Sequence, residues 1–501
     1  MEVLAFVLYF VAMLGIGVFF FFKSRSKSEA DYFLGGRSMG PWVTAMSAQA
    51  SDMSAWLLMG FPGSVLAFGL GQAWIGIGLA LGTTLNWIFV AKRLRKFSKA
   101  AGDSITFPQY LSNRFATANP ALKIICAIVF LISFTIYVAS AFSAGADVFT
   151  QLFPSLKRMY AMIIFAVIIL IYTFLGGFKA VCWTDFFQGL LMLVALLAVP
   201  IVAATTMNLD KAALTEVYTY VEGGVTKEAA FGASVFGASW QEIVTGLSWG
   251  LGYFGMPHIL VRFMSIEKPS KIKKSAIVAI IWVLITLVAA ILIAYIGRMA
   301  VGKELIQDAG NQKLVFIALA RKLFPPFLAG ILLAAIIAAS MSTADSQLLV
   351  ASSSFTSDIY KPIIRKNASE KETLWVGRVV VVIIAVIAFF IASNGGSGAQ
   401  AIMNMVENAW GLFGASFGPA VLLSLFWRRF TYLGAVAGIV VGAVVDIVWL
   451  LYLTAPTGVY EILPGFVASA VVCIVVSLID KKPSQEVLAI FDRATDKSID
   501  D

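Results

Sequence analysis

The sequence has little charge, little cysteine and almost no histidine. Of its 501 residues 13% are charged, three are cysteine and one is histidine, whereas an ordinary soluble domain carries about 25% charged residues. One histidine cannot supply an HExxH metal site, and it argues against Ser–His chemistry. The cysteines lie far apart in apolar runs, which predicts small buried side chains and neither a disulfide nor a metal framework. A GxxxxGK[ST] string for ATP is also lacking. The sequence therefore predicts that the protein is not an enzyme.

Apolar residues fill the place of the missing charge. They make up 60% of the chain, and the mean hydropathy is +0.88. This composition is typical of a polytopic membrane protein. Because apolar runs recur without a long polar interruption, we predict a single transmembrane domain over residues 1–480. The polar tail, 481–501, is too short for a catalytic or signalling domain, which argues against a membrane sensor.

The apolar runs have the length of membrane spans. A helix needs about 20 apolar residues to cross a bilayer. The first run lacks a basic leader and a small-x-small cleavage site, so it is interpreted as a helix and not as a signal peptide. We predict an all-α fold with about 13 transmembrane helices, at 2–22, 42–60, 67–91, 123–149, 159–177, 181–206, 241–261, 275–297, 326–347, 375–393, 403–427, 431–453 and 463–479.

The basic residues predict the orientation. With the N-terminus outside, most of the 37 lysines and arginines fall in inside loops, among them the clusters at 92–96 and 268–274. This asymmetry follows the positive-inside rule and explains the net charge of +9 without nucleic acid as a partner. The odd number of spans then puts the C-terminus in the cytoplasm, and the plasma membrane is the expected location. The longest outside loop, 207–240, carries a turn signal at Gly223–Gly224.

A carboxylate stands within the second span, in the string ASDMSAW. On a continuous helix Ser47, Ser51 and Ser54 form one polar stripe, and Asp52 shares a neighbouring face with Trp56. Charged residues at membrane depth are costly and are functional candidates. The alternative is that the serines join helices and that the aspartate pairs with a hidden base. Because no lysine or arginine is expected at that depth, we favour a bound cation.

A second polar cluster lies in the ninth span. Ser342 and Ser346 align on one helix face, and Asp345 lies beside them. Hard cations such as sodium prefer hydroxyl, carboxylate and backbone carbonyl ligands. Serine-rich runs are also common at plain helix interfaces, so this cluster alone is ambiguous. Asp185 in the sixth span is equally balanced between a structural role and a place on an ion route.

The seventh span is predicted to break. Four glycines precede Pro257, which clashes with the carbonyl of Tyr253. Trp249, Tyr253 and Pro257 would form one aromatic wall, suited either to plain packing or to stacking against a small substrate. His258 and Arg262 follow at the expected cytoplasmic end, and a proton relay through this lone histidine is disfavoured.

The two interrupted spans stand five spans apart. Secondary transporters with inverted repeats place their discontinuous helices at matching positions of two halves. We therefore predict repeats at about 42–206 and 241–427. A channel would show a continuous polar stripe through several spans. Here the polar residues cluster at two or three depths, which favours an occluded site.

Several long strings resemble the sodium/solute symporter family. YTFLGGFKA at 172–180 is similar to a family signature. Strings that resemble its sodium/proline symporter branch are GGRSMGPWVTAMSAQASDMSAWLLMGFPG, SFTIYVASAFSAGA, WTDFFQGLLM, WGLGYFGMPHILVRFM and AGILLAAIIAASMSTADSQLLV. The resemblance implies a leucine-transporter-like five-plus-five inverted repeat with one extra helix before it and two after. It also implies sodium-coupled secondary active uptake of L-proline by alternating access. Sodium would be the coupling ion, with no organic cofactor and no obligate protein partner outside the lipid bilayer.

The resemblance also assigns site residues. The main sodium site would use backbone carbonyls, hydroxyls and one carboxylate, from Ala50, Asp52, Met53, Ala339, Ser342 and Thr343. Proline would lie near Ser54, Trp56, Tyr137, Trp249, Tyr253 and Pro257. A second sodium site of some family members matches Asp185, Ser342, Asp345 and Ser346. The chain departs from the branch at Ala55, where a glycine is expected, at Met256, where a glutamine is expected, and at Asp345, where a hydroxyl is expected. The first two make the pocket more apolar, and pantothenate or another small carboxylate is the alternative substrate.

Overall fold

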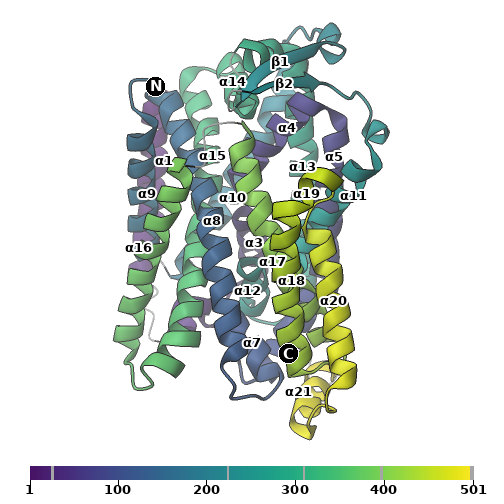
Figure 1. Cartoon of the computed structure of the whole chain (residues 1–501). Helices are drawn as coiled ribbons and strands as arrows, with labels where there is room; N and C mark the ends of the chain where they lie inside the picture. Colours follow the sequence, from purple (N-terminus) through teal and green to yellow (C-terminus); the bar gives the residue numbers. More distant parts are fainter. Residues whose placement is uncertain (24–27, 176, 223–224, 309–310, 395–398, 497–501) are drawn as a thin grey trace.

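Long helices run side by side along one axis of the molecule (Figure 1). In this computed structural model the described residues are 1–23, 28–175, 177–222, 225–308, 311–394 and 399–496. Ten of the predicted spans are long helices: α1 (Glu2–Lys23), α8 (Ala121–Leu152), α9 (Arg158–Leu175), α10 (Phe178–Thr206), α13 (Ile272–Lys303), α15 (Pro326–Ser353), α16 (Glu370–Asn394), α17 (Ala399–Phe426), α18 (Tyr432–Tyr452) and α20 (Ile462–Ile479).

The other three predicted spans are also helical but are not regular throughout. The third is α5 (Ala73–Leu85), which continues through a π-helical turn into α6 (Lys92–Ala100). It runs past the predicted end at residue 91 because α6 is amphipathic, with buried Leu94 and Phe97 and basic residues on its other face. The second and seventh spans are each split into two helices, α3 (Pro41–Met53) with α4 (Gly60–Phe68) and α11 (Trp240–Ser248) with α12 (Pro257–Ser265).

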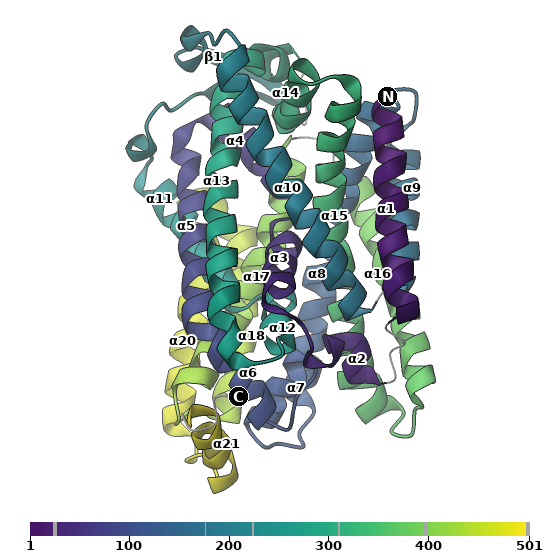
Figure 2. The same cartoon turned by 180° about the vertical axis from the view of Figure 1, so that it is seen from behind.

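The two chain ends lie at opposite ends of the bundle, as an odd number of spans requires (Figures 1 and 2). The described short helices cap these ends: α2 (Glu29–Leu34), α7 (Phe107–Arg114), α14 (Val315–Leu323), α19 (Thr454–Thr457) and α21 (Gln485–Thr495). Helices α7 and α21 lie at the end that holds the C-terminus, and α14 lies at the opposite end. The basic cluster of α6 lies at the end that holds the C-terminus (Figure 2).

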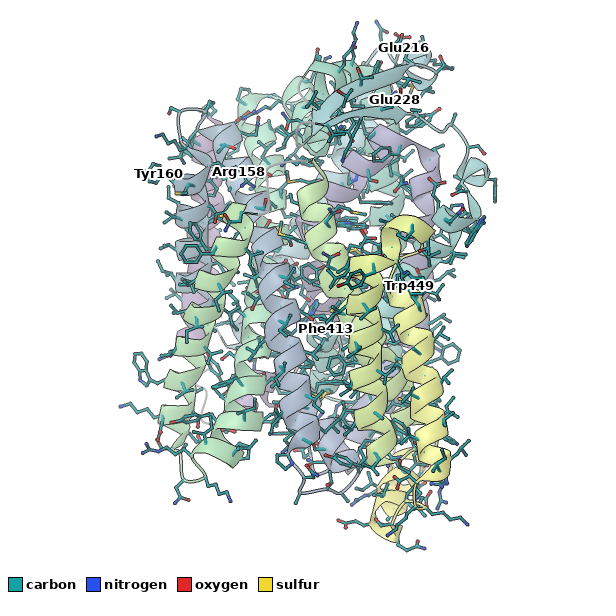
Figure 3. The ribbon with its side chains drawn as sticks, in the orientation of Figure 1. Arg158, Tyr160, Glu216, Glu228, Phe413 and Trp449 are labelled. Carbon is teal, nitrogen blue, oxygen red and sulfur yellow. The ribbon has the colours of Figure 1, made fainter. Side chains whose placement is uncertain are left out.

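A β-hairpin stands where sequence analysis predicted only a loop. Strand β1 (Val217–Glu222) pairs antiparallel with β2 (Val225–Ala230). Glu216 and Glu228 lie on this hairpin at the end that carries the N-terminus (Figure 3). The predicted turn at Gly223–Gly224 lies outside the described residues. Arg298 of α13 holds the hairpin, because its guanidinium donates to the carbonyls of Glu216 and Ala229.

Glycines let the helices around the two breaks approach closely. A methyl group on Gly82 of α5 would lie 2.2 Å from the carbonyl oxygen of Gly250, and one on Gly252 would lie 2.0 Å from Nε1 of Trp410. Only residues without a Cβ fit such contacts. The segment 249–254 is therefore packed against both α5 and α17.

Candidate functional site

The first helix break is centred on Ser54. Helix α3 ends at Met53, and Ser54 takes a φ of 48°, which is rare for a residue other than glycine. Its hydroxyl oxygen accepts a hydrogen bond from the backbone N–H of Trp56 at 3.1 Å. A short 3₁₀ turn, Ala55–Leu57, then leads toward α4. The side chain of Ser54 thus stabilises the break itself.

The second break replaces α-helix by a 3₁₀ turn, Trp249–Phe254, before α12 begins at Pro257. The proline occupies the first helical position, where its missing N–H has no cost. The carbonyl of Tyr253 accepts a 3.0 Å hydrogen bond from Nδ2 of Asn86. The predicted conflict between Pro257 and this carbonyl is thus resolved by unwinding and by a side-chain donor from the π-helical turn after α5.

Asp52 joins the two breaks. The hydroxyl of Tyr253 donates to Oδ2 of Asp52 at 2.6 Å. The hydroxyl of Tyr137, on α8, donates to the backbone carbonyl of Asp52 at 3.2 Å. Within the described chain, no ion pair with lysine or arginine reaches Asp52. The buried carboxylate therefore has hydrogen-bond donors and no cationic side chain.

Aromatic rings surround the same point. The ring centroids of Trp56 and Trp249 are 5.5 Å apart in a stacked pair. Tyr253 meets Trp410 edge to face at 5.0 Å, and Nε1 of Trp410 donates to the carbonyl of Trp249 at 2.8 Å. These side chains enclose a small cavity, lined by Asp52, Met53, Trp56, Leu79, Tyr137, Trp249, Tyr253, Val406 and Trp410.

The cavity is too small for an organic solute as it stands. Its volume is about 10 Å³, which is about the space that one water molecule needs. A ligand the size of an amino acid requires the lining side chains to move apart. Val406 and Trp410 lie on α17, so a movement of α17 would open the cavity.

Four of the six residues predicted to contact the substrate line this cavity: Trp56, Tyr137, Trp249 and Tyr253. Ser54 does not line it, because its side chain is bonded at the break. Pro257 does not line it either, because a 3₁₀ turn has about three residues per turn and the i, i+4, i+8 face is lost.

Sequence reasoning missed Leu79, Val406 and Trp410 as cavity residues. Leu79 and Val406 carry no signal, because they stand in ordinary apolar spans. The available signal for Trp410 was a tryptophan three residues after the membrane carboxylate Glu407.

The residues predicted for the main sodium site lie where α3 ends against α15. The hydroxyl of Ser342 donates to the carbonyl of Ala50 at 2.8 Å, and the carbonyl of Ala339 is a second acceptor at 3.2 Å. The hydroxyl oxygen of Thr343 is buried and without a hydrogen-bond partner. Met53 is the last residue of α3. The carboxylate of Asp52 points instead toward Tyr253 and the cavity.

A base does lie inside the protein, against Asp185. Arg262 was expected near the cytoplasmic surface, but its side chain is buried and forms a 3.0 Å ion pair with Oδ2 of Asp185. The guanidinium also donates to the hydroxyls of Ser47 and Ser346. The expectation of no buried base therefore holds for Asp52 and is wrong for Asp185. One sequence signal for a buried Arg262 was available. Arg262 stands four residues after His258, one helical turn later, and its guanidinium donates to the carbonyl of His258.

Three of the four residues predicted for the second sodium site meet around this arginine. The hydroxyl of Ser346 accepts a hydrogen bond from Arg262 and donates one to Oδ1 of Asp345 at 3.3 Å. One oxygen of Asp185 and one of Asp345 are buried without a partner. Ser342 bonds instead to Ala50 and Ala339. The cluster holds two carboxylates and one guanidinium, so one negative charge is uncompensated if both acids are ionised.

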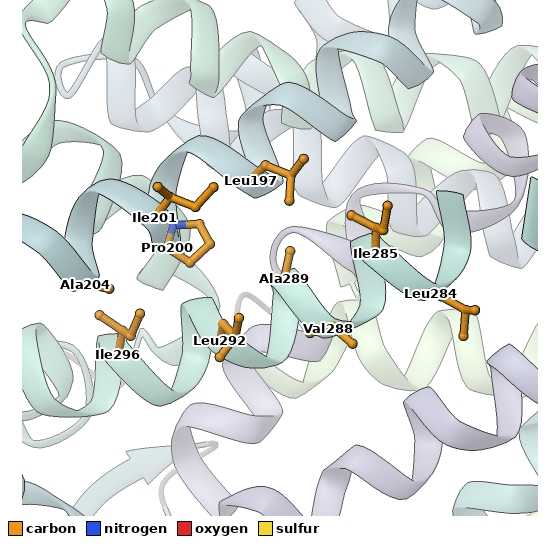
Figure 4. A pocket seen from close by; sticks show the side chains of 10 residues that line it. All are labelled: Leu197, Pro200, Ile201, Ala204, Leu284, Ile285, Val288, Ala289, Leu292 and Ile296. Atoms are coloured by element: carbon orange, nitrogen blue, oxygen red, sulfur yellow. The ribbon is translucent and has the colours of Figure 1, made fainter. Parts of the chain in front are cut away.

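A further cavity near the membrane-spanning helices is of a different kind. A groove of about 510 Å³ lies between α10 and α13 (Figure 4). Its lining is apolar: Leu197, Pro200, Ile201, Ala204, Leu284, Ile285, Val288, Ala289, Leu292 and Ile296. No charged or hydrogen-bonding side chain faces it, so it does not suit a charged solute.

The fold and site define a secondary transporter with two broken helices that meet at a buried carboxylate. The family model of the Sodium:solute symporter family matches residues 32–442. The chain belongs to that family, which consists of transporters and not of enzymes. A sodium/proline symporter of Haemophilus influenzae is 42% identical over 502 residues, covering 98% of this chain and 97% of that protein. One of Staphylococcus aureus (strain JH9) is 43% identical over 485 residues, covering 95% and 92%.

Solved structures agree on the architecture. A Na⁺-coupled sialic acid symporter, substrate-bound and outward-open, superimposes with a TM-score of 0.75 at 18% identity, covering 97% of this chain and 98% of that one. Mhp1, a nucleobase-cation-symport-1 family transporter, superimposes with a TM-score of 0.56 at 15% identity, covering 93% of this chain and 99% of that one. The fold is therefore leucine-transporter-like, with two inverted five-helix repeats, one helix before them and two after.

Proposed function

We propose that this symporter takes up L-proline together with sodium by alternating access. Relatives that are 42% and 43% identical over nearly the whole chain are sodium/proline symporters. The single structural observation that carries the proposal is the bond between Asp52 and Tyr253, which ties both helix breaks to one aromatic cavity. Such breaks offer free backbone groups to ions and to small zwitterions.

Sodium is proposed to bind where α3 ends against α15. The partnerless hydroxyl of Thr343 and the paired groups of Ser342 and Ala50 supply the oxygens that a hard cation prefers. The proposed ligands are Ala50, Met53, Ala339, Ser342 and Thr343, and the carboxylate of Asp52, which points toward the cavity, supplies charge that attracts the ion. Sodium here would order the end of α3. Since the same segment leads into the cavity through Ser54 and Trp56, sodium binding raises proline affinity, and the reverse coupling has the same size.

Proline is proposed to occupy an opened form of the aromatic cavity. Its ring would stack on Trp56, Trp249 and Tyr253, while Tyr137 and Ser54 lie near its polar end and Pro257 behind the break. The space requires α17 to move outward, because Val406 and Trp410 close the cavity. Movement of one repeat against the other then exposes the site to the opposite side.

The driving force is sufficient for concentrative uptake. One charge that moves through 100 mV releases about 2.3 kcal/mol. A tenfold sodium gradient adds about 1.4 kcal/mol. The sum, about 3.7 kcal/mol, sustains an accumulation of several hundred-fold.

A second sodium site at Asp185, Ser342, Asp345 and Ser346 is part of the proposal. Arg262 compensates one of the two carboxylates, which leaves charge for one further cation. Reversal-potential measurements on proteoliposomes at varied sodium and proline gradients give the number of sodium ions per proline. A ratio of one would exclude coupling through this second site.

For the membrane arrangement we propose a single domain over 1–480 with repeats at 42–206 and 241–427, and a tail at 481–501. The N-terminus is proposed to face outside and the C-terminus the cytoplasm, in the plasma membrane, because the basic cluster of α6 lies at the C-terminal end. Neither an organic cofactor nor an obligate protein partner is needed by this mechanism.

The test uses purified protein in liposomes with labelled L-proline. We expect saturable uptake that requires an inward sodium gradient and is blocked by excess unlabelled proline. Pantothenate and other small carboxylates serve as competitors. Uptake of pantothenate with no effect of proline would overturn the substrate, and an ohmic sodium current without saturation would indicate a channel.

A further inference from the structure

Two buried acidic side chains, Asp446 and Glu461, converge on Gly411 behind the aromatic wall of the cavity. Asp446 lies on α18 and Glu461 directly precedes α20, and each residue is 1% exposed. Oδ1 of Asp446 and Cγ of Glu461 lie 3.1 and 3.4 Å from the position that a methyl group on Gly411 would take. The missing side chain of Gly411, on α17, thus leaves the space in which the two acids meet.

No basic group compensates this pair. Oδ1 of Asp446 and Oε1 of Glu461 have no hydrogen-bond partner. The other oxygen of Glu461, Oε2, accepts a hydrogen bond from the hydroxyl of Thr454 at 3.1 Å. In the part of the chain that the structure describes, no ion pair from lysine, arginine or histidine reaches either acid. Two adjacent carboxylates without a counter-charge cannot both stay ionised in a dry interior.

The neighbouring elements add further acid and no base. Helix α17 brings Glu407, whose backbone carbonyl accepts a 2.6 Å hydrogen bond from the hydroxyl of Tyr460. Helix α11 brings the neutral hydroxyl of Thr245, which accepts from the backbone N–H of Tyr460. The 3₁₀ turn brings the ring of Trp249, whose centroid is 5.3 Å from that of Tyr460. Tyr460 therefore connects the acid pair to the wall of the cavity.

We propose that Asp446 and Glu461 form an acid pair that binds one proton, separate from the sodium and substrate sites. The proton neutralises one carboxyl, so that a single negative charge remains between the two side chains. In this form the pair holds α18 and α20 against Gly411 of α17. Loss of the proton leaves two facing negative charges and pushes α17 outward. Since α17 also closes the cavity, the protonated pair stabilises the closed position.

Infrared difference spectroscopy of the full-length protein in liposomes tests the proposal. The C=O stretching band of a protonated carboxylic acid reports the bound proton. We expect the double variant Asp446→Asn with Glu461→Gln to remove this band, because neither side chain can then carry the proton. Glu242→Gln is the control, since this exposed residue of a capping box forms no buried pair. It should remove a carboxylate band and leave the acid band unchanged.

Two results would overturn the proposal. One is an unchanged acid band in the double variant Asp446→Asn with Glu461→Gln, which would mean that the pair carries no proton in the wild type. The other is a carboxylate band in the wild type that shifts on exchange of sodium for potassium and is lost in Asp446→Asn, which would mean a bound metal cation. Each variant carries neutral isosteres, so each should keep the unfolding midpoint of the wild type, which reports on folding. The spectrum does not depend on which solute is transported, so this test and the uptake test fail separately.

Discussion

Oδ2 of Asp52 accepts a 2.6 Å hydrogen bond from the hydroxyl of Tyr253, across the gap between the two broken helices. The bond joins the carboxylate of Asp52, in the first broken helix, to the hydroxyl of Tyr253, in the second. Tyr137 adds a third helix through the backbone carbonyl of Asp52. Any group that binds at Asp52 therefore affects both breaks at once.

Asp52→Asn should abolish most sodium-dependent uptake. The amide keeps the size of the side chain and can still accept from Tyr253, but it removes the charge that attracts a cation. Sodium activation of proline uptake in liposomes is the measurement. Tyr253→Phe is the companion variant, because it keeps the charge and removes a bond worth about 1.5–3 kcal/mol. Uptake and sodium activation like wild type in Asp52→Asn would show that this carboxylate has no part in coupling.

Trp249→Ala should weaken proline binding at saturating sodium. The ring stacks on Trp56 and packs on Tyr460, and such aromatic pairs are worth about 0.5–1.5 kcal/mol each. We therefore expect roughly a tenfold rise in the proline Kd, measured by equilibrium binding of labelled proline. Trp375→Ala is the control, since this residue is 54% exposed on α16. Equal Kd values for wild type and Trp249→Ala would remove the stacking wall from the mechanism.

The sequence predicted the spans, the two breaks and a carboxylate at membrane depth, because each depends on local chemistry. Pro257 and its glycines dictate a break whatever surrounds them, and a span needs only apolar length. The partner of Asp185 depended on tertiary structure, since Arg262 is 77 positions away in the chain and meets it only in the folded bundle. Trp410 was missed for the same reason. The hairpin 217–230 was missed because its two short strands read as a polar loop.

Gly82→Ala should destabilise the protein, because it separates α5 from the 3₁₀ turn Trp249–Phe254. A Cβ at this position would meet the carbonyl oxygen of Gly250 at 2.2 Å and force α5 away from the 3₁₀ turn. Overpacking of this kind costs about 1–3 kcal/mol. Thermal unfolding in detergent, followed by tryptophan fluorescence, is the measurement. Gly15→Ala is the matched control, because nothing lies within 4 Å of its Cβ position. Equal midpoints for the two variants would contradict the close approach.

Arg262→Gln should be more destabilising than the double variant Arg262→Gln with Asp185→Asn. Removal of one partner of a buried ion pair leaves the other charge uncompensated, at a cost of about 3–5 kcal/mol. The second substitution removes that charge and should restore part of the loss. Unfolding midpoints of both single variants and the double variant form the cycle. Strictly additive midpoints would mean that the two side chains do not interact.

Phe491→Ala should release the C-terminal helix α21, whereas Arg428→Gln should loosen it only slightly. The ring of Phe491 is buried, meets Phe97 of α6 edge to face at 5.3 Å and lies 5.1 Å below the guanidinium carbon of Arg114. Burial of such a ring is worth about 1.5–3 kcal/mol. The ion pair of Arg428 with Asp492 is exposed, and such pairs contribute little. Hydrogen exchange of the amides of α21, read by mass spectrometry, ranks the two variants.

The pH dependence of the same helix separates the two contacts. The hydrogen bond from Arg428 lowers the pKa of Asp492 below its ordinary value of 3.8. Stability from this pair is therefore fully present above that value and is lost only as the pH falls through the lowered pKa. Between about pH 5 and pH 8 the intrinsic-rate-corrected exchange of α21 should stay constant in the wild type. In Phe491→Ala helix α21 is already released, so its exchange should be fast throughout this range. Faster exchange in Arg428→Gln than in Phe491→Ala at neutral pH would reverse the order of the two contacts and show that the ion pair holds the helix.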